Sequence, residues 1–246
     1  MWVRQVGYVS PRLVRVTFAG PDLERLTVVH PAASVRLLLP YPGTQELVVP
    51  SWNGNEFLSD GRRPAIRTFT PRRVDPGTFE LKLDIVIHGG GVASEWAQTA
   101  EPGDPAAISG PRRGYAIDRD APCFFLGGDE TAIPAISQIL QALPADRPVQ
   151  VHIEVAHPDA RIALPDHPRV TAEWCDLTPD APSGDALFAA VRRADLEPGV
   201  RVWVAGEAAA MQRIRRHLFE DRGLPRSQAS VRGYWKHGRS GDAGDT

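Results

Sequence analysis

The chain has 246 residues, 42% of them hydrophobic and 24% charged, the balance of a globular protein with room for two modest domains. Its formal net charge of −2 gives the chain as a whole no bias toward nucleic acid or membranes, and no uninterrupted apolar run approaches the roughly 20 residues that span a bilayer. The N-terminus lacks the basic and then apolar layout of a secretory signal, so we expect a cytoplasmic protein that binds neither nucleic acid nor membrane.

Residue types that bind metals are scattered through the chain. Cys123 and Cys175 belong to no CxxC pair, and the seven histidines form no HExxH or comparable spacing. Isolated cysteines of this kind are mostly buried free thiols. The sequence therefore predicts no metal site.

The first half of the chain has the pattern of a β domain. Apolar and polar residues alternate in several short runs, and Gly-Pro or Pro-Gly pairs mark turns between them. The runs that predict strands are residues 14–18, 35–39, 79–87 and 106–108. Many short strands with almost no helix predict a small barrel.

The segment Arg67-Thr68-Phe69-Thr70 combines an aromatic ring, hydroxyl groups and a positive charge. A strand would place Arg67 and Phe69 on one face and Thr68 and Thr70 on the other. These are the groups that a flavin dinucleotide needs for its ring, its ribityl chain and its pyrophosphate. An ordinary strand with a surface arginine and a core phenylalanine explains the segment equally well.

A glycine-rich loop, HGGGVASEWA at residues 88–97, follows the strand that ends near Ile87 and opens a short helix near Ala93. Glycines let backbone N–H groups approach a ligand, and a helix N-terminus with Ser94 favours phosphate oxygens. The pattern therefore favours a phosphate-binding loop over a flexible turn. We interpret His88 as a structural residue rather than as a base.

From about residue 120 strands and helices alternate. Strands are predicted at 123–126, 149–155 and 200–204, with helices after Gly128 and at 185–194 and 207–221. This order predicts a mostly parallel, doubly wound sheet. We expect a barrel domain over residues 1–117, an α/β domain over 118–239 and a disordered tail over 240–246.

In three segments of the second half, polar residues lie at or near the end of a predicted strand. Thr131 offers a hydroxyl to ribose or phosphate, whereas Asp129 and Glu130 would repel phosphate and suit helix capping. Glu207 suits capping or a ribose contact, and both possibilities stay open. The segment 231–238 places aromatic beside basic residues, which suits a flavin or an anionic ligand, or an edge strand packed on the core.

Together these segments resemble the siderophore-interacting protein family of FAD-dependent ferric reductases. The matching segments stand in the family's order and span nearly the whole chain: RTFT at 67–70, HGGGVASEWA at 88–97, GDETAIPAI at 128–136, AGEA at 205–208 and GYW at 233–235. The resemblance implies a flavin-reductase-type Greek-key β barrel followed by a doubly wound parallel-sheet nucleotide-binding domain.

The resemblance also implies site residues. The positions that match FAD contacts are Arg67, Thr68, Phe69, Thr70, Asp84, Val86, His88, Ala93 and Ser94. Those on the nicotinamide side are Asp129, Glu130, Thr131, Ala132 and Glu207, with Trp235 near the flavin. Basic residues for an anionic ferric siderophore are Lys236, Arg232 and Arg239, with Arg112 and Arg113 as weaker candidates.

Two positions depart from the family pattern. Phe69 stands where the family usually has tyrosine, and Val92 replaces its proline; both changes weaken the expectation of tight FAD retention. The implied activity is transfer of electrons from NADH or NADPH through FAD to siderophore-bound Fe³⁺, with iron as substrate and no catalytic acid, base or nucleophile. The alternatives are a flavin reductase with another acceptor and a non-catalytic siderophore-binding module. We expect a monomer.

Overall fold

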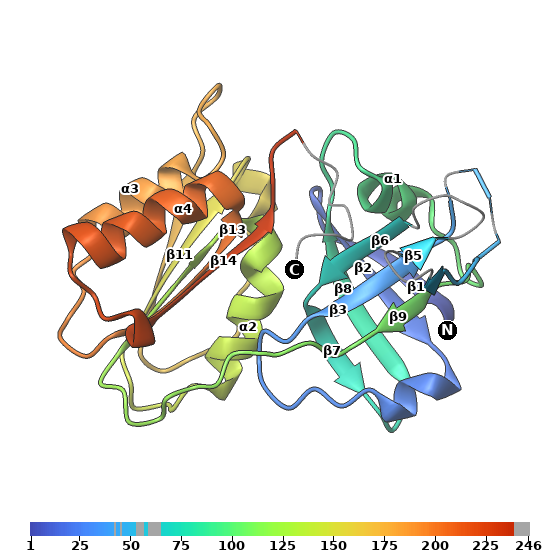
Figure 1. The fold of residues 1–246 in the computed structure, drawn as a ribbon, viewed down its shortest axis with the longest axis horizontal. Coiled ribbons are helices and arrows are strands. Elements are labelled where there is room, and N and C mark those ends of the chain that lie inside the picture. Colours follow the sequence, from blue (N-terminus) through green and yellow to red (C-terminus); the bar gives the residue numbers. More distant parts are fainter. Residues whose placement is uncertain (42, 45, 53–56, 59–64, 239–246) are drawn as a thin grey trace. The chain divides into compact units, whose positions relative to one another are not determined.

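The chain folds into two compact units that divide between Gly114 and Tyr115 (Figure 1). The computed structural model describes residues 1–41, 43–44, 46–52, 57–58 and 65–238. The predicted boundary lay after residue 117, within the irregular segment that leads to the first strand of the second unit. The predicted tail over 240–246 lies outside the described residues. In the described part, no helix has the length and apolar character needed to cross a bilayer.

In its described residues, the first unit is built from short antiparallel strands and one α-helix. The strands are β1 (Trp2–Ser10), β2 (Leu13–Ala19), β3 (Val35–Leu39), β4 (Ser51–Trp52), β5 (Phe57–Leu58), β6 (Ala65–Phe69), β7 (Pro71–Asp75), β8 (Glu80–Val86) and β9 (Ala107–Ser109). A 3₁₀ helix covers Pro21–Arg25, and α1 covers Val92–Thr99. Two sheets, β1-β2-β8-β7 and β6-β3-β9, account for most of the strands.

The two sheets join into the predicted barrel. Val3 of β1 exchanges two backbone hydrogen bonds of 2.8 Å with Gly103 and Asp104, just before β9. On the other side only Thr70 separates β6 from β7, so the chain passes directly from one sheet to the other. Closure of this kind protects the edge strands.

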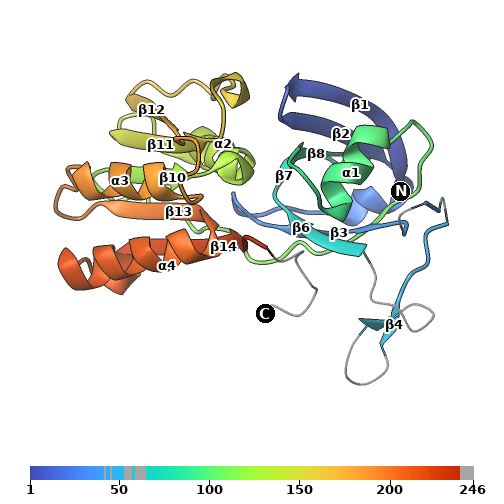
Figure 2. The ribbon, with the colours of Figure 1, turned by 90° about the horizontal axis from the view of Figure 1, so that it is seen from above.

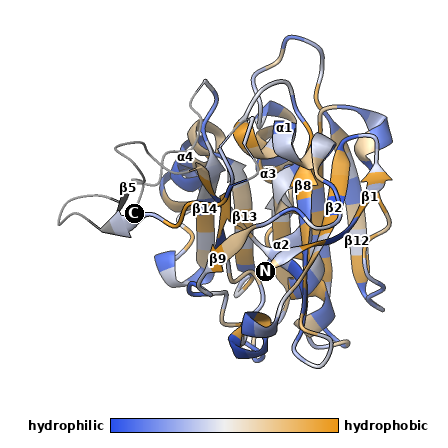
Figure 3. Cartoon of the chain, turned by 90° about the vertical axis from the view of Figure 1, so that its right-hand side faces the viewer, coloured by the Kyte–Doolittle hydropathy of each residue, from blue (hydrophilic) through white to orange (hydrophobic). Residues whose placement is uncertain are grey.

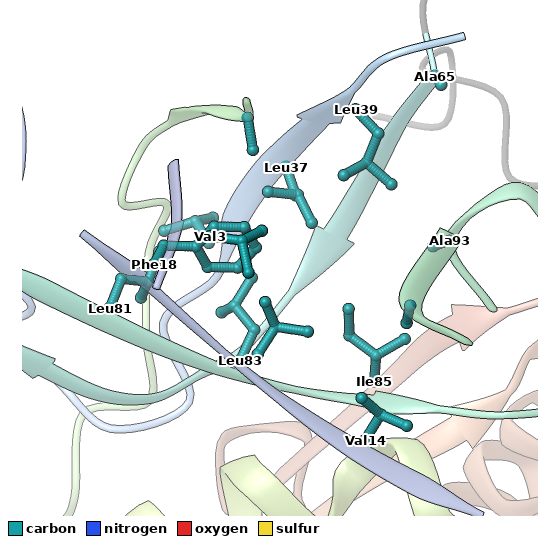
Figure 4. Close-up of a cluster of buried hydrophobic side chains, with 14 of the residues drawn as sticks. Val3, Val14, Phe18, Leu37, Leu39, Ala65, Leu81, Leu83, Ile85 and Ala93 are labelled. Carbon is teal, nitrogen blue, oxygen red and sulfur yellow. The ribbon is translucent and has the colours of Figure 1, made fainter. Parts of the chain in front are cut away.

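The barrel core is formed by apolar residues that alternate with polar residues along the central strands. Val14, Val16 and Phe18 of β2 face Leu81, Leu83 and Ile85 of β8, all within one buried cluster (Figure 4). Orange parts of β2 and β8 in Figure 3 mark the hydrophobic residues of these strands. Each such side chain contributes about 1.5–3 kcal/mol when it is removed from water.

The sequence did not predict strands β1 and β7. Only Val3 of β1 is fully buried, and register shifts interrupt its pairing with β2 after Val3 and after Tyr8. A bulge moves the following side chains to the other face, so the period-2 pattern is lost. Strand β7 has a comparable shift between Pro71 and Arg73.

The second unit is the predicted doubly wound α/β domain (Figure 2). Its parallel strands are β10 (Phe124–Gly128), β11 (Val149–Val155), β12 (Val170–Asp176), β13 (Arg201–Glu207) and β14 (Ala229–Trp235), in the order β12-β11-β10-β13-β14. Its helices are α2 (Ile133–Ala142), α3 (Asp185–Arg193) and α4 (Ala208–Arg216), with a π turn at His217–Asp221 and 3₁₀ turns at Glu130–Ala132, Pro158–Ala160 and Arg226–Gln228.

Helices cover both faces of this sheet. A Cβ added at Gly127 would meet Leu187 of α3, whereas one added at Gly128 would meet Ile136 of α2. Neighbouring residues of a strand point to opposite faces, so α2 and α3 lie on opposite sides. The strand order reverses between β10 and β13, which is where ligands bind in open α/β sheets.

Element bounds in the second unit follow the sequence pattern closely, except at an edge. The predicted strand at 149–155 is β11, and the predicted helix at 207–221 is α4 together with the π turn. Strand β12, at the sheet edge, was not predicted, because all but one of its residues are exposed or half-buried.

Candidate functional site

Strand β6 presents Arg67, Thr68 and Phe69 in the predicted alternation. Arg67 and Phe69 stand opposite Leu37 and Val35 of β3, and directly opposed residues share a face. Phe69 packs against the barrel core, and Arg67 is half-buried and donates a 2.8 Å hydrogen bond to the carbonyl of Ile66. Thr68 is exposed, whereas Thr70, just after the strand, is buried.

The glycine-rich loop between β8 and α1 is held by one side chain. The Ser94 hydroxyl accepts a 3.0 Å hydrogen bond from the N–H of His88 and donates a 2.9 Å hydrogen bond to its carbonyl. Ser94 is only 2% exposed. Its hydroxyl therefore ties the two ends of the loop together, which leaves the loop backbone as the group that a ligand could meet.

The glycines give this loop its shape and its open side. Gly91 precedes α1 with φ of 104°, and a Cβ there would approach the His88 ring to 3.0 Å, so only glycine fits. A Cβ added at Gly89 or Gly90 would meet nothing within 4 Å. The N-cap residue of α1 is Gly91, which has no side chain to bind the first N–H groups of the helix.

Asp84 of β8 is engaged by an arginine that the sequence patterns did not single out. Its buried carboxylate accepts hydrogen bonds of 2.6 and 2.8 Å from Nε and Nη2 of Arg15. The hydrogen bond to Asp84 raises the pKa of Arg15, while burial lowers the pKa of the neighbouring Arg72. Arg15 was missed because only the register of β2 against β8 places it opposite Asp84.

The predicted residues of the first unit thus come from neighbouring elements. Helix α1 contacts both β6 and β8, and β6 also contacts β8. Val86 ends β8 and His88 follows two residues later, half-buried and exposed respectively. Ala93 is buried at the start of α1. The pairing of β7 with β8 ends at Leu83, before Asp84 and Val86.

In the second unit Asp129 is buried at the end of β10. Its Oδ1 accepts hydrogen bonds from the N–H and the hydroxyl of Thr131, at 2.9 and 2.5 Å, and its Oδ2 accepts one of 2.7 Å from Nε1 of Trp235. Burial raises the pKa of Asp129. The side chain therefore caps the turn, as the capping interpretation predicted, and links two segments 106 residues apart.

The other acidic residues at this sheet end also accept hydrogen bonds from the chain itself. Glu130 accepts one of 2.8 Å from the N–H of Ala156, and Glu207 accepts one of 2.9 Å from the N–H of Ala210 at the start of α4. Glu154 of β11, absent from the sequence prediction, accepts hydrogen bonds from two N–H groups at the start of α3. All three carboxylates are buried.

The predicted residues of strand β14 and its end lie at the surface. Trp235 is 36% exposed although its Nε1 is bound to Asp129. Arg232 is half-buried, with a 3.2 Å hydrogen bond to Ser230, and Lys236 is exposed. Ala132 is fully buried against Gly128, so its side chain is not available to a ligand. Arg239 lies outside the described residues.

Comparison with protein families matches each unit separately. Residues 2–115 match the sequence model of the siderophore-interacting FAD-binding domain, and residues 121–238 match that of the siderophore-interacting protein.

Individual proteins are similar over most of the chain. The uncharacterized protein Rv2895c of Mycobacterium tuberculosis is 41% identical over 195 residues, which cover 74% of this chain and 69% of that protein. The ferric vibriobactin reductase ViuB of Vibrio cholerae is 26% identical, with 96% of this chain and 88% of ViuB covered. The crystal structure of a siderophore utilization protein from T. fusca superposes with a TM-score of 0.85 at 36% identity and covers 97% of this chain and 92% of that one.

Proposed function

The chain belongs to the siderophore-interacting protein family, and from this premise we propose that it is an FAD-dependent oxidoreductase that reduces ferric siderophore iron. NADH or NADPH supplies the electrons, and ferrous iron is released in the cytoplasm. The similarity to a protein named ferric vibriobactin reductase supports this activity.

The glycine-rich loop at 88–94 is the observation that carries the proposal. The Ser94 hydroxyl ties the two ends of the loop together, and Gly89 and Gly90 border open space that a side chain would fill. The loop leads into the N-terminus of α1, where N–H groups point outward and the helix dipole favours negative charge. A pyrophosphate group has the charge and the acceptor oxygens that this arrangement requires.

The residues of the first unit that would hold FAD are Arg67, Thr68, Phe69, Thr70, Asp84, Val86, His88, Ala93 and Ser94. Bound FAD supplies the means to accept two electrons together and to release them singly. Arg67 offers a permanent positive charge, and Phe69 an aromatic ring held by the barrel core. Ser94 acts through the loop backbone that it holds, because its hydroxyl already binds His88, whereas the carboxylate of Asp84 already binds the Arg15 side chain.

For the second unit we propose a nicotinamide-nucleotide site at the carboxyl ends of β10 and β13. Asp129, Thr131 and Glu207 shape it, and Trp235 presents an exposed ring beside them. Because negative charges repel each other, the buried carboxylates at this end of the sheet disfavour the binding of an additional phosphate group beside them. Lys236 and Arg232 supply positive charge for an anionic siderophore, and Arg239 is a further candidate.

An anaerobic spectral titration tests this function. We expect purified protein with FAD to be bleached by NADH or NADPH and to regain its flavin spectrum when a ferric siderophore is added, with Fe²⁺ trapped by a ferrous chelator. Recovery with other acceptors but not with ferric siderophores would indicate a different flavin reductase. Protein that is colourless when purified and does not bind added FAD would indicate a non-catalytic binding module.

A further inference from the structure

Away from the strand ends, the edge pair β11–β12 brings together three side chains of metal-binding type. The parallel register pairs His152 with Glu173, and Cys175 follows two residues along β12. Side chains at positions i and i+2 of a strand share a face, and so do registered neighbours. One donor atom from each of the three lies within 4.8 Å of the others.

The distances suit direct coordination. Nδ1 of His152 lies 3.3 Å from Oε2 of Glu173, and Sγ of Cys175 lies 3.8 Å from Oε1 of the same carboxylate. Ligands at 2.0–2.3 Å around a tetrahedral Zn²⁺ are separated from one another by about 3.3–3.8 Å. These two distances involve different oxygens of Glu173, and all three donors lie within 4.8 Å of one another, so rotation of the side chains would have to bring them onto one ion.

His152 supplies a second, independent indication. It is 9% exposed, and its Nδ1 is shielded from solvent without a hydrogen-bond partner. The ring is fixed by stacking on Phe125, with centroids 5.0 Å apart and planes inclined by 16°. Nδ1 lies 3.3 Å from Oε2 of Glu173, a charged contact that is not a hydrogen bond. A buried nitrogen without a hydrogen bond is costly, and a metal ion would satisfy it.

We propose that His152, Glu173 and Cys175 bind one divalent transition-metal ion, with Zn²⁺ as the best match to an imidazole, carboxylate and thiolate set. A water molecule or an exogenous ligand would complete the coordination. This site goes beyond the reductase activity, and it departs from the sequence-based expectation of no metal. Spacing along the chain could not show it, because strand register alone brings His152 to Glu173.

Metal binding would release one proton, from Cys175, and would compete with one ion pair, that of Arg193 with Glu173. The Cys175 thiol loses its proton to solvent as the sulfur–metal bond forms, and the metal charge compensates for the desolvation that raises the pKa of this thiol to about 11. Arg193 of α3 forms an ion pair with Glu173. Its half-exposed guanidinium must leave the carboxylate, so Arg193 weakens metal binding.

The test is a cobalt titration of the tag-free, FAD-loaded protein after treatment with a chelator, under nitrogen. Difference spectra against the protein before addition remove the flavin absorption. We expect one equivalent of Co²⁺ to produce a thiolate-to-cobalt charge-transfer band with visible d–d bands, and one equivalent of Zn²⁺ to abolish both. No thiolate band in the wild type would overturn the proposal.

Variants separate this site from adventitious binding. Cys175→Ser should lose the charge-transfer band, whereas Cys123→Ser, which removes the other buried free thiol, should retain it. Arg193→Gln should bind Co²⁺ about threefold more tightly, because the competing ion pair is absent. A band that persists in folded Cys175→Ser, or affinity that falls in Arg193→Gln, would contradict the assignment.

Discussion

The two candidate sites satisfy their polar groups in opposite ways. In the first unit, the Ser94 hydroxyl binds the loop backbone and leaves Gly89 and Gly90 beside open space. In the second unit, the carboxylates of Asp129 and Glu207 bind N–H groups of the chain itself. A sequence motif marks both places alike, but the first leaves its loop backbone beside open space, whereas the carboxylates of the second already bind groups of the fold.

The largest effect should come from the buried ion pair of the barrel. Arg15→Met leaves the Asp84 carboxylate buried without its partner, and we expect a loss of about 3 kcal/mol in the free energy of unfolding. Urea denaturation measures it. Arg4→Met is the control, because the Arg4–Glu80 pair on the same sheet has an exposed arginine and should cost less than about 0.5 kcal/mol. Equal losses would show that Asp84 does not depend on Arg15.

The next effect tests how tightly the buried carboxylate of Asp129 is packed in the second unit. A Cβ at Gly206 would lie 2.6 Å from Oδ2 of Asp129, so Gly206→Ala should cost about 2 kcal/mol of stability by overpacking. Gly233, its registered neighbour on β14, has only ordinary contacts at 3.4 Å. Gly233→Ala should therefore change the thermal midpoint far less. A tolerant Gly206→Ala would mean that Asp129 has room to move.

The complementary prediction concerns the glycine-rich loop of the first unit. Gly89→Ala adds a methyl group where no protein atom lies within 4 Å, so we expect unchanged stability but about tenfold weaker FAD binding, equivalent to about 1.4 kcal/mol. Fluorescence titration with FAD measures this. The matched control is Gly7→Ala on β1, which also meets open space. FAD affinity that is unaltered at Gly89 would remove the main support for the loop as a pyrophosphate site.

The smallest effect concerns the Trp235–Asp129 hydrogen bond. Trp235→Phe keeps an aromatic ring but removes the N–H, and we expect a loss of about 1 kcal/mol at neutral pH. Burial raises the pKa of Asp129, so the folded state binds this proton more tightly than the unfolded state, and the contribution of this carboxyl to stability falls as pH rises from about 4. The Trp235 N–H favours the charged form of this carboxylate, so its loss matters more once Asp129 is ionised. We therefore expect the stability deficit of Trp235→Phe to grow between pH 4 and 7 in urea melts. A deficit independent of pH would indicate lost packing instead.

Local patterns in the sequence determined much of this protein. Strands β2, β3, β8 and β11 were predictable because one or both of their faces are buried. A strand buried on one face alternates apolar and polar residues, and a strand buried on both faces is apolar throughout. The glycine-rich loop and the start of α4 were predictable because turns and caps depend on neighbours in the chain. The family resemblance followed from the order of such local segments.

Only the tertiary structure decided which distant residues meet. Strand order places Arg15 against Asp84 and Trp235 against Asp129, and the parallel register of β11 and β12 sets His152 beside Glu173. Edge strands such as β1 and β12 were missed because solvent imposes no periodicity on an exposed face. Contacts of this kind depend on how elements pair across long stretches of chain, and no local pattern records that pairing.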